Sequence, residues 1–218
     1  TPAMPTPDAA LPVSDPARSN VPDTPISYHD FLDWLDEDTR AEWVDGEIIL
    51  MSPAASIHQR IVALLDRTLG LLVEQKQLGE LLLAPFQMRL KERPSGREPD
   101  VLFVKEAHLD WIQDTYLDGP ADLVVEVLSA ESGPRDRGEK YDEYEAAGIA
   151  EYWLIDPIRD EVVLWRLDDD ARYRVVFHGG TGRIESAVVE GFWVEAEWFH
   201  ADTMPNALDV LRQWKLID

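Results

Sequence analysis

Two carboxylates lie in stretches of sequence that otherwise consist of apolar residues. Asp100 follows Pro99 at the start of the run Val101–Val104, and Glu126 lies inside the run Leu123–Leu128. A charged side chain in a buried strand is costly unless it is paired, hydrogen-bonded or bound to a metal ion. Each carboxylate alone can be a strand-end group or the structural partner of a nearby arginine. Together, on two neighbouring strands, they predict a shared site for one divalent cation, and their oxygen ligands suit Mg²⁺ or Mn²⁺.

Phosphodiester chemistry at such a site also needs a positive charge near the reacting phosphate. Lys140 is the candidate, because it lies on an expected helix that leaves the Glu126 strand through the basic segment 135–137. The alternative is a lysine on a solvated helix face. His58 is a second candidate. It shares a helix face with apolar residues at i+4, i+7 and i+11, so it points toward the edge of the core. Two roles stay open for His58: a histidine of the core, or a group that supports the site or contacts the substrate phosphate.

Hydrophobic periodicity and turn residues divide the chain into helices and strands. The expected helices cover residues 27–36, 56–75, 138–147 and 205–215. The expected strands flank the Asp45-Gly46 turn and cover 79–84, 86–91, 99–104, 122–128, 151–157, 161–167, 173–177 and 184–189. The strands 122–128 and 151–157 should be parallel, because a helix separates them. The pattern predicts an α/β (α+β) fold: a mixed β-sheet core flanked by helices, with a C-terminal β meander.

The length of 218 residues is enough for one domain with its own core. Residues 1–26 hold seven of the fifteen prolines and few large apolar side chains. Such a composition is typical of a disordered segment. We therefore expect a disordered, proline-rich leader over 1–26 and a single domain over 27–218.

The composition excludes several function classes. The chain has no cysteine, which rules out disulfides, thiolate metal sites and a cysteine nucleophile. Its 20 basic and 43 acidic residues give a net charge of −23, which repels bulk nucleic acid and anionic membranes. No long apolar run and no export signal stand out, so we expect a cytoplasmic protein without membrane partners.

Residues from about 41 to 157 resemble the Uma-type restriction-endonuclease family of the PD-(D/E)XK nuclease superfamily. The resemblance rests on the order and spacing of several segments together, which are Glu42–Ile48, Met51–Pro53, His58-Gln59, Pro99–Val101, Ala121–Ser129, Asp136-Arg137 with Lys140, and Gly148 with Glu151–Pro157.

The resemblance implies a restriction-endonuclease-like core and metal-dependent phosphodiester hydrolysis. Carried over by position, Asp100 and Glu126 would be metal-binding carboxylates, with Val127 as a further metal ligand. Asp100, Glu126, Lys140 and His58 would form the catalytic set. The superfamily's usual lysine, two residues after the glutamate, is Leu128 here. As in the family's own variant, the lysine role would have to move to Lys140.

Three functions stay open. The leading one is a Mg²⁺- or Mn²⁺-dependent DNA endonuclease whose binding to DNA is weak or highly specific. The alternative is a catalytically silent nuclease-fold scaffold for self-association, for example as a homodimer, or for partner binding. A third is a metal-free hydrolase with Asp100 and Glu126 as acid and base. Dependence on a divalent cation separates the first from the third, and loss of metal binding favours the second.

Overall fold

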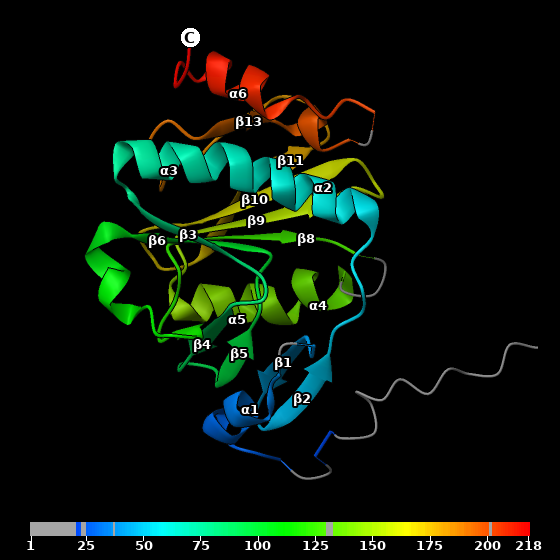
Figure 1. Cartoon of the computed structure of the whole chain (residues 1–218), viewed down its shortest axis with the longest axis vertical. Helices are drawn as coiled ribbons and strands as arrows, with labels where there is room; N and C mark the ends of the chain where they lie inside the picture. Colours follow the sequence, from blue (N-terminus) through cyan, green and yellow to red (C-terminus); the bar gives the residue numbers. More distant parts are fainter. Residues whose placement is uncertain (1–20, 23–24, 37, 130–132, 201) are drawn as a thin grey trace, which may run out of the picture.

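The computed structural model describes residues 21–22, 25–36, 38–129, 133–200 and 202–218. It contains two main β-sheets, with helices on both sides of the larger sheet (Figure 1). This is the mixed α/β fold predicted from the sequence. Most of the leader expected over residues 1–26 lies outside the described residues.

The larger sheet is mixed and has the strand order β11-β10-β9-β8-β6-β3. Its strands are β3 (Gly79–Leu83), β6 (Val101–Lys105), β8 (Leu123–Val127), β9 (Glu151–Asp156), β10 (Glu161–Leu167) and β11 (Tyr173–Gly179). β8 and β9 are parallel, as predicted from the helix between them, and the other neighbours are antiparallel. Every residue of β8 and β9 is buried, because helices cover both faces at the centre of this sheet.

The smaller sheet has the order β2-β1-β5-β4-β7. Its strands are β1 (Ala41–Val44), β2 (Glu47–Leu50), β4 (Gln87–Leu90), β5 (Ser95–Arg97) and β7 (Tyr116–Leu117). The predicted hairpin is present, and Asp45 and Gly46 both have positive φ angles, 48° and 93°, as a two-residue hairpin turn requires. The sequence pattern predicts one mixed sheet. The structure has two, because β5, too short to show a periodic pattern, pairs with both β1 and β4.

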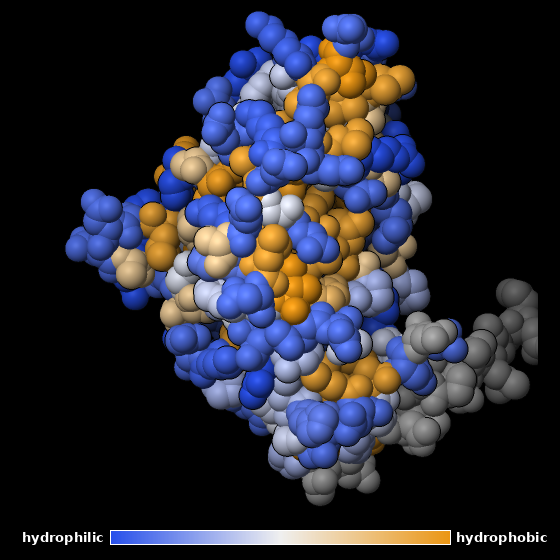
Figure 2. Space-filling view, turned by 60° about the vertical axis from the view of Figure 1, so that its left-hand side comes forward, coloured by the Kyte–Doolittle hydropathy of each residue, from blue (hydrophilic) through white to orange (hydrophobic). Residues whose placement is uncertain are grey.

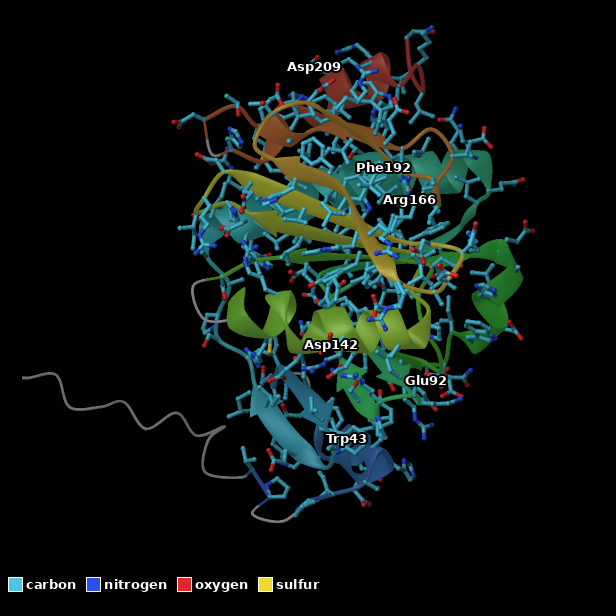
Figure 3. The ribbon with its side chains drawn as sticks, turned by 180° about the vertical axis from the view of Figure 1, so that it is seen from behind. Trp43, Glu92, Asp142, Arg166, Phe192 and Asp209 are labelled. Carbon is cyan, nitrogen blue, oxygen red and sulfur yellow. The ribbon has the colours of Figure 1, made fainter. Side chains whose placement is uncertain are left out.

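Helices pack on both faces of the larger sheet (Figure 1). On one face lie α2 (Ser56–Leu65), the π-helical turn η2 (Asp66–Gly70), α3 (Leu71–Lys76) and α6 (Ala207–Gln213). The first three follow one another directly and form the long helix predicted over 56–75. The other face carries α4 (Gly133–Arg137) and α5 (Glu139–Ala147). Figure 3 shows α5, which bears Asp142, between the larger sheet and the smaller sheet that bears Trp43.

The remaining elements are short. α1 (Tyr28–Trp34) packs its Tyr28 and Phe31 with Trp43 of the smaller sheet. The 3₁₀ helices are η3 (Glu106–Trp111) and η4 (Ala196–Phe199). The predicted meander is present in β10 and β11, but the strand predicted over 184–189 is shorter. It is β12 (Arg183–Glu185), which pairs with β13 (Trp193–Glu195) in a separate ribbon.

Candidate active site

Asp100 and Glu126 meet at the ends of two adjacent antiparallel strands. Val101 of β6 lies opposite Val125 of β8, so one further step along this register places Asp100 opposite Glu126. Directly opposed residues of an antiparallel pair share one face of the sheet. Both side chains are buried, with 8% and 4% of their residue surfaces exposed. The structure therefore brings together the two carboxylates that the sequence singled out.

Asp100 is held by two groups. Its Oδ2 accepts a hydrogen bond of 2.7 Å from the main-chain N–H of Val127, and its Oδ1 lies 3.0 Å from Nε2 of His58. His58 is in the first turn of α2 and is buried, which agrees with its expected place at the core edge. Its Nδ1 is buried and has no hydrogen-bond partner among the described residues. His58 is thus placed to orient Asp100.

Glu126 is bound by two side chains of α5. Lys140 Nζ and Tyr144 Oη donate to the same oxygen, Oε1, over 2.9 and 2.7 Å. Lys140 and Tyr144 are four residues apart and so lie on one face of the helix. That face packs on β8, because α5 follows β8 in the chain and runs back over the sheet before the parallel strand β9 begins. Leu128, at the superfamily's usual lysine position, is instead buried in the apolar core beside Tyr144.

Lys140 contacts two more carboxylates besides Glu126. Its Nζ lies 2.9 Å from Oε1 of Glu42, on β1, and 3.1 Å from Oδ1 of Asp136, on α4. Only 2% of the lysine side chain is exposed. Burial alone would lower the pKa of Lys140, but Glu126, Glu42 and Asp136 outweigh it and hold this pKa well above its ordinary value. The side chain therefore stays an ammonium ion in the interior.

Arg97 extends the cluster into the smaller sheet. Its guanidinium is completely buried and lies 2.9 Å from Oε2 of Glu42 and 2.5 Å from Oε1 of Glu143. Glu143 also accepts a hydrogen bond of 2.9 Å from the Ser95 hydroxyl. Burial would raise the pKa of Glu42, but Lys140 and Arg97 outweigh it and bring this pKa to about 2. Glu42 thus joins the two cations and links the sheets electrostatically.

Sequence reasoning did not assign Glu42, Glu143 or Tyr144 to the site. A signal for Glu42 was present, because it interrupts the apolar run Ala41–Val44 as Glu126 interrupts its own strand. Arg97 was expected among the basic residues near the site, but its short polar segment gives no sign that it is buried. Glu47, which directly follows the Asp45-Gly46 turn, is exposed to solvent on β2 and lies outside the cluster.

A comparison with protein families gives the chain a place among known proteins. Residues 28–197 match Uma2, a family described as "Putative restriction endonuclease". The chain belongs to this family. The match confirms the resemblance drawn from the segments between residues 41 and 157, and it covers both sheets and the whole charged cluster.

Two further proteins are similar to this Uma2 member. The crystal structure of "a putative nuclease belonging to DUF820" from Anabaena variabilis has a TM-score of 0.65 and 15% identity, over 80% of this chain and 97% of that one. This likeness shows a shared fold. "Uncharacterized protein sll1609" of Synechocystis is 28% identical over 118 residues, which are 54% of this chain and 66% of that protein. The chain thus matches just under two thirds of that relative.

The cluster contains more carboxylates than positively charged side chains, and this excess affects whether it can bind a metal ion. Among the described residues, Lys140 and Arg97 are the permanent cations of the cluster, and they contact the four buried carboxylates of Glu42, Glu126, Asp136 and Glu143, while the buried Asp100 contacts His58. Burial raises the pKa of Glu126 well above its ordinary value; Lys140 opposes this shift, and the charges of Asp136 and Asp100 add to it. An excess of buried negative charge favours binding of a further cation.

The donor set also restricts the kind of ion. In the described part of the chain, no three His, Asp or Glu side chains form a ready-made metal site. The ligands of an ion here would be the carboxylates of Asp100 and Glu126, the main-chain carbonyl oxygen of Val127, and water molecules. Mg²⁺ commonly binds one or two carboxylates and keeps several waters. The residues present therefore fit Mg²⁺ or Mn²⁺.

Proposed function

We propose that the protein is a metal-dependent endonuclease that hydrolyses phosphodiester bonds of DNA. The observation that carries this proposal is the meeting of Asp100 and Glu126 at one strand end, with the Lys140 ammonium 2.9 Å from Glu126. Membership of the Uma2 family supports it. Asp100, Glu126 and Val127 would hold Mg²⁺ or Mn²⁺, which supplies charge stabilisation at the phosphate when bound.

The side chains around the ion have separate tasks in this proposal. The Val127 N–H and His58 hold Asp100, so both of its oxygens are fixed before an ion binds. Lys140 keeps its positive charge at the Glu126 end of the site and offsets the charge that develops on the phosphate. Tyr144 holds Glu126 from the same helix face as Lys140. His58 acts on Asp100 and is a positioning residue.

The charge distribution favours weak or selective binding to DNA. The net charge is −23, and several basic residues already contact carboxylates of the protein. Arg89 and Lys91 both contact Asp118, at 3.4 and 3.1 Å, and Arg137 lies 2.7 Å from Asp156. Salt-dependent attraction to phosphates therefore contributes little, and contacts at the site itself must select the substrate.

Cleavage of supercoiled plasmid DNA with Mg²⁺ or Mn²⁺ tests the proposal. Asp100→Asn should abolish nicking, because the amide can still accept the Val127 N–H but removes the negative charge that binds the ion. Glu47→Gln is the matched control, since it neutralises an exposed carboxylate on β2 and should cleave like the wild type. Cleavage that persists in a chelator would contradict the metal dependence and favour Asp100 and Glu126 as metal-free acid and base.

One observation favours the alternative, a catalytically silent scaffold. Lys140 is enclosed by three carboxylates, and both oxygens of Asp100 are engaged within the protein. A cluster satisfied in this way can serve structure alone. Calorimetric titration with Mg²⁺ separates the two functions: a wild-type chain that neither binds the ion nor nicks DNA would support the scaffold.

A further inference from the structure

The six-stranded sheet has a free edge at β3, beside the helix formed by η2 and α3. β3 stands last in the strand order, and in the described part of the chain β6 is the only strand that it pairs with. A groove of about 550 Å³ follows this edge and is lined by residues of the helix and of β3, among them Arg67, Gly70, Leu71, Glu74 and Leu81. The side of the molecule that bears α3 and β3 shows apolar surface among hydrophilic residues (Figure 2).

The main chain of β3 shows which of its groups are free. Ala84 N–H donates to Asp100 O at 3.3 Å, and Glu106 N–H donates to Leu78 O at 3.0 Å. In the register of β3 and β6, the even-numbered residues of this segment therefore bond to β6. The N–H and C=O groups of Gly79, Leu81 and Leu83 point to the open edge. Leu81, the middle residue of β3, thus presents one donor and one acceptor outward.

The helix beside this edge presents an apolar residue between two opposite charges. Leu71 is 47% exposed, and Arg67 and Glu74 lie one turn before it and about one turn after it on the same face. Within the described residues neither Arg67 nor Glu74 makes an ion pair. Gly70 lies over the middle of β3, because a Cβ atom placed on it would be 3.6 Å from Cδ2 of Leu81. The helix therefore contacts the middle residue of β3 at Gly70.

We propose that this surface binds a second copy of the chain around a two-fold axis that runs beside Leu81, at the open edge of β3. Leu81 would pair antiparallel with the partner's Leu81 and exchange both main-chain hydrogen bonds with it. Gly79 would pair with the partner's Leu83, and the two six-stranded sheets would become one. The two Leu71 side chains would meet on the helix side of this continuous sheet.

Charge complementarity identifies the occupant as a second copy. A two-fold interface requires a surface that is complementary to itself. Arg67 and Glu74 are equally far from the point between Gly70 and Leu71, so antiparallel helices place Arg67 beside the partner's Glu74, and Glu74 beside the partner's Arg67. Edge strands are usually protected by charges or proline, and β3 has Glu80 as its single charged residue.

Sedimentation analysis of charge-reversed variants tests the dimer. The wild type should sediment at twice the chain mass of 24.8 kDa. Arg67→Glu and Glu74→Arg should each weaken association by at least about tenfold, because each substitution makes two symmetry-related pairs repulsive. The double variant, which exchanges the charges, should restore the dimer. Arg60→Glu, on the exposed side of α2, is the control and should not change association.

A cysteine scan gives a second, independent readout, since the natural chain contains no cysteine. Leu71→Cys places two thiols at the proposed axis, so mild oxidation should yield a disulfide-linked dimer. Asp142→Cys, at an exposed position of α5 on the opposite face of the larger sheet (Figure 3), should remain largely uncrosslinked. A monomeric wild type at tens of micromolar, or single charge reversals that remain fully dimeric, would overturn the proposal. Neither result depends on nuclease activity.

Discussion

Lys140 and Glu126, on a helix and a strand that the chain connects by a short segment, form an ion pair of 2.9 Å in the protein interior. Tyr144, one turn further along α5, donates to the same glutamate oxygen at 2.7 Å. This arrangement keeps one oxygen of Glu126 occupied by the protein. It also keeps a positive charge within reach of whatever binds beside Asp100, and it connects the ion pair to Glu42 and Arg97.

Removal of the Lys140 ammonium should separate catalysis from metal binding. Lys140→Ala should abolish plasmid nicking and leave Mg²⁺ affinity unchanged or slightly higher, because a repelling charge next to Glu126 is lost. The variant leaves three buried carboxylates without their cation, which costs about 3–5 kcal/mol of stability. Added Mg²⁺ should therefore raise its unfolding temperature more than that of the wild type. Lys105→Ala, a half-exposed lysine, is the control. If Lys140→Ala nicked plasmid DNA at the wild-type rate, a different residue would supply the positive charge near the phosphate.

The buried Arg97 should be among the most stabilising charges of the smaller sheet. Arg97→Met keeps much of the side-chain volume but leaves Glu42 and Glu143 facing each other, so we expect a loss of about 3–5 kcal/mol in the free energy of unfolding. Arg93→Met removes a half-exposed arginine 3.7 Å from Asp142 and should cost less than about 1 kcal/mol. Urea unfolding measures both. Equal losses of unfolding free energy in Arg97→Met and Arg93→Met would contradict the expectation that the buried arginine stabilises the fold more than the exposed one.

The low pKa of Glu42 predicts a specific acid sensitivity. This carboxyl faces Lys140 and Arg97, with Glu98 and Glu126 nearby, and its pKa is about 2 in the fold against an ordinary 4.5. A depressed pKa contributes stability that is fully present above pH 4.5 and is lost as the pH falls toward 2. The shift corresponds to about 3 kcal/mol. In Glu42→Gln this contribution disappears, so its stability deficit should be large at pH 6 and should shrink toward pH 2.

Urea unfolding of Glu42→Gln and of Glu47→Gln across this range provides the measurement. Glu47→Gln, at an exposed position on β2, is the control. A Glu42→Gln deficit of the same size at pH 6 and at pH 2.5 would contradict the assignment of this pKa to Glu42.

The start of the folded domain can be located by two truncations. The main chain of Ile26 receives a hydrogen bond of 2.9 Å from the Trp43 indole, and its own N–H donates to Gly46 O at 2.9 Å. Removal of residues 1–20 should leave the unfolding temperature unchanged, because that segment has little apolar surface to bury. Removal of residues 1–26 also deletes both bonds and should cost about 1–3 kcal/mol. Identical melting of the two truncations would place the boundary at Ser27, as the composition predicts.

The sequence alone identified the elements whose pattern is local. The Asp45-Gly46 turn, the parallel pair β8 and β9, and the long helix through α2 and α3 follow from turn chemistry and apolar periodicity, which act over a few residues. Asp100 and Glu126 were found in the same way, because a carboxylate inside an apolar run is visible without a structure. Lys140 and His58 were found from their places on the expected helices, and the family resemblance then implied a catalytic role for both.

The tertiary structure decided which charges meet. β5 has three residues and no periodic signal, yet it joins β1 to β4 in the smaller sheet and places Arg97 beside Glu143, which lies 46 residues away in the chain. Glu42, on β1 of the smaller sheet, contacts Lys140 of α5, which also contacts Glu126 in the larger sheet. Such contacts depend on how helices and sheets pack, because an ion pair between distant residues leaves no periodic mark in the sequence. The same holds for the contact between the helix and β3 at Gly70 and Leu81.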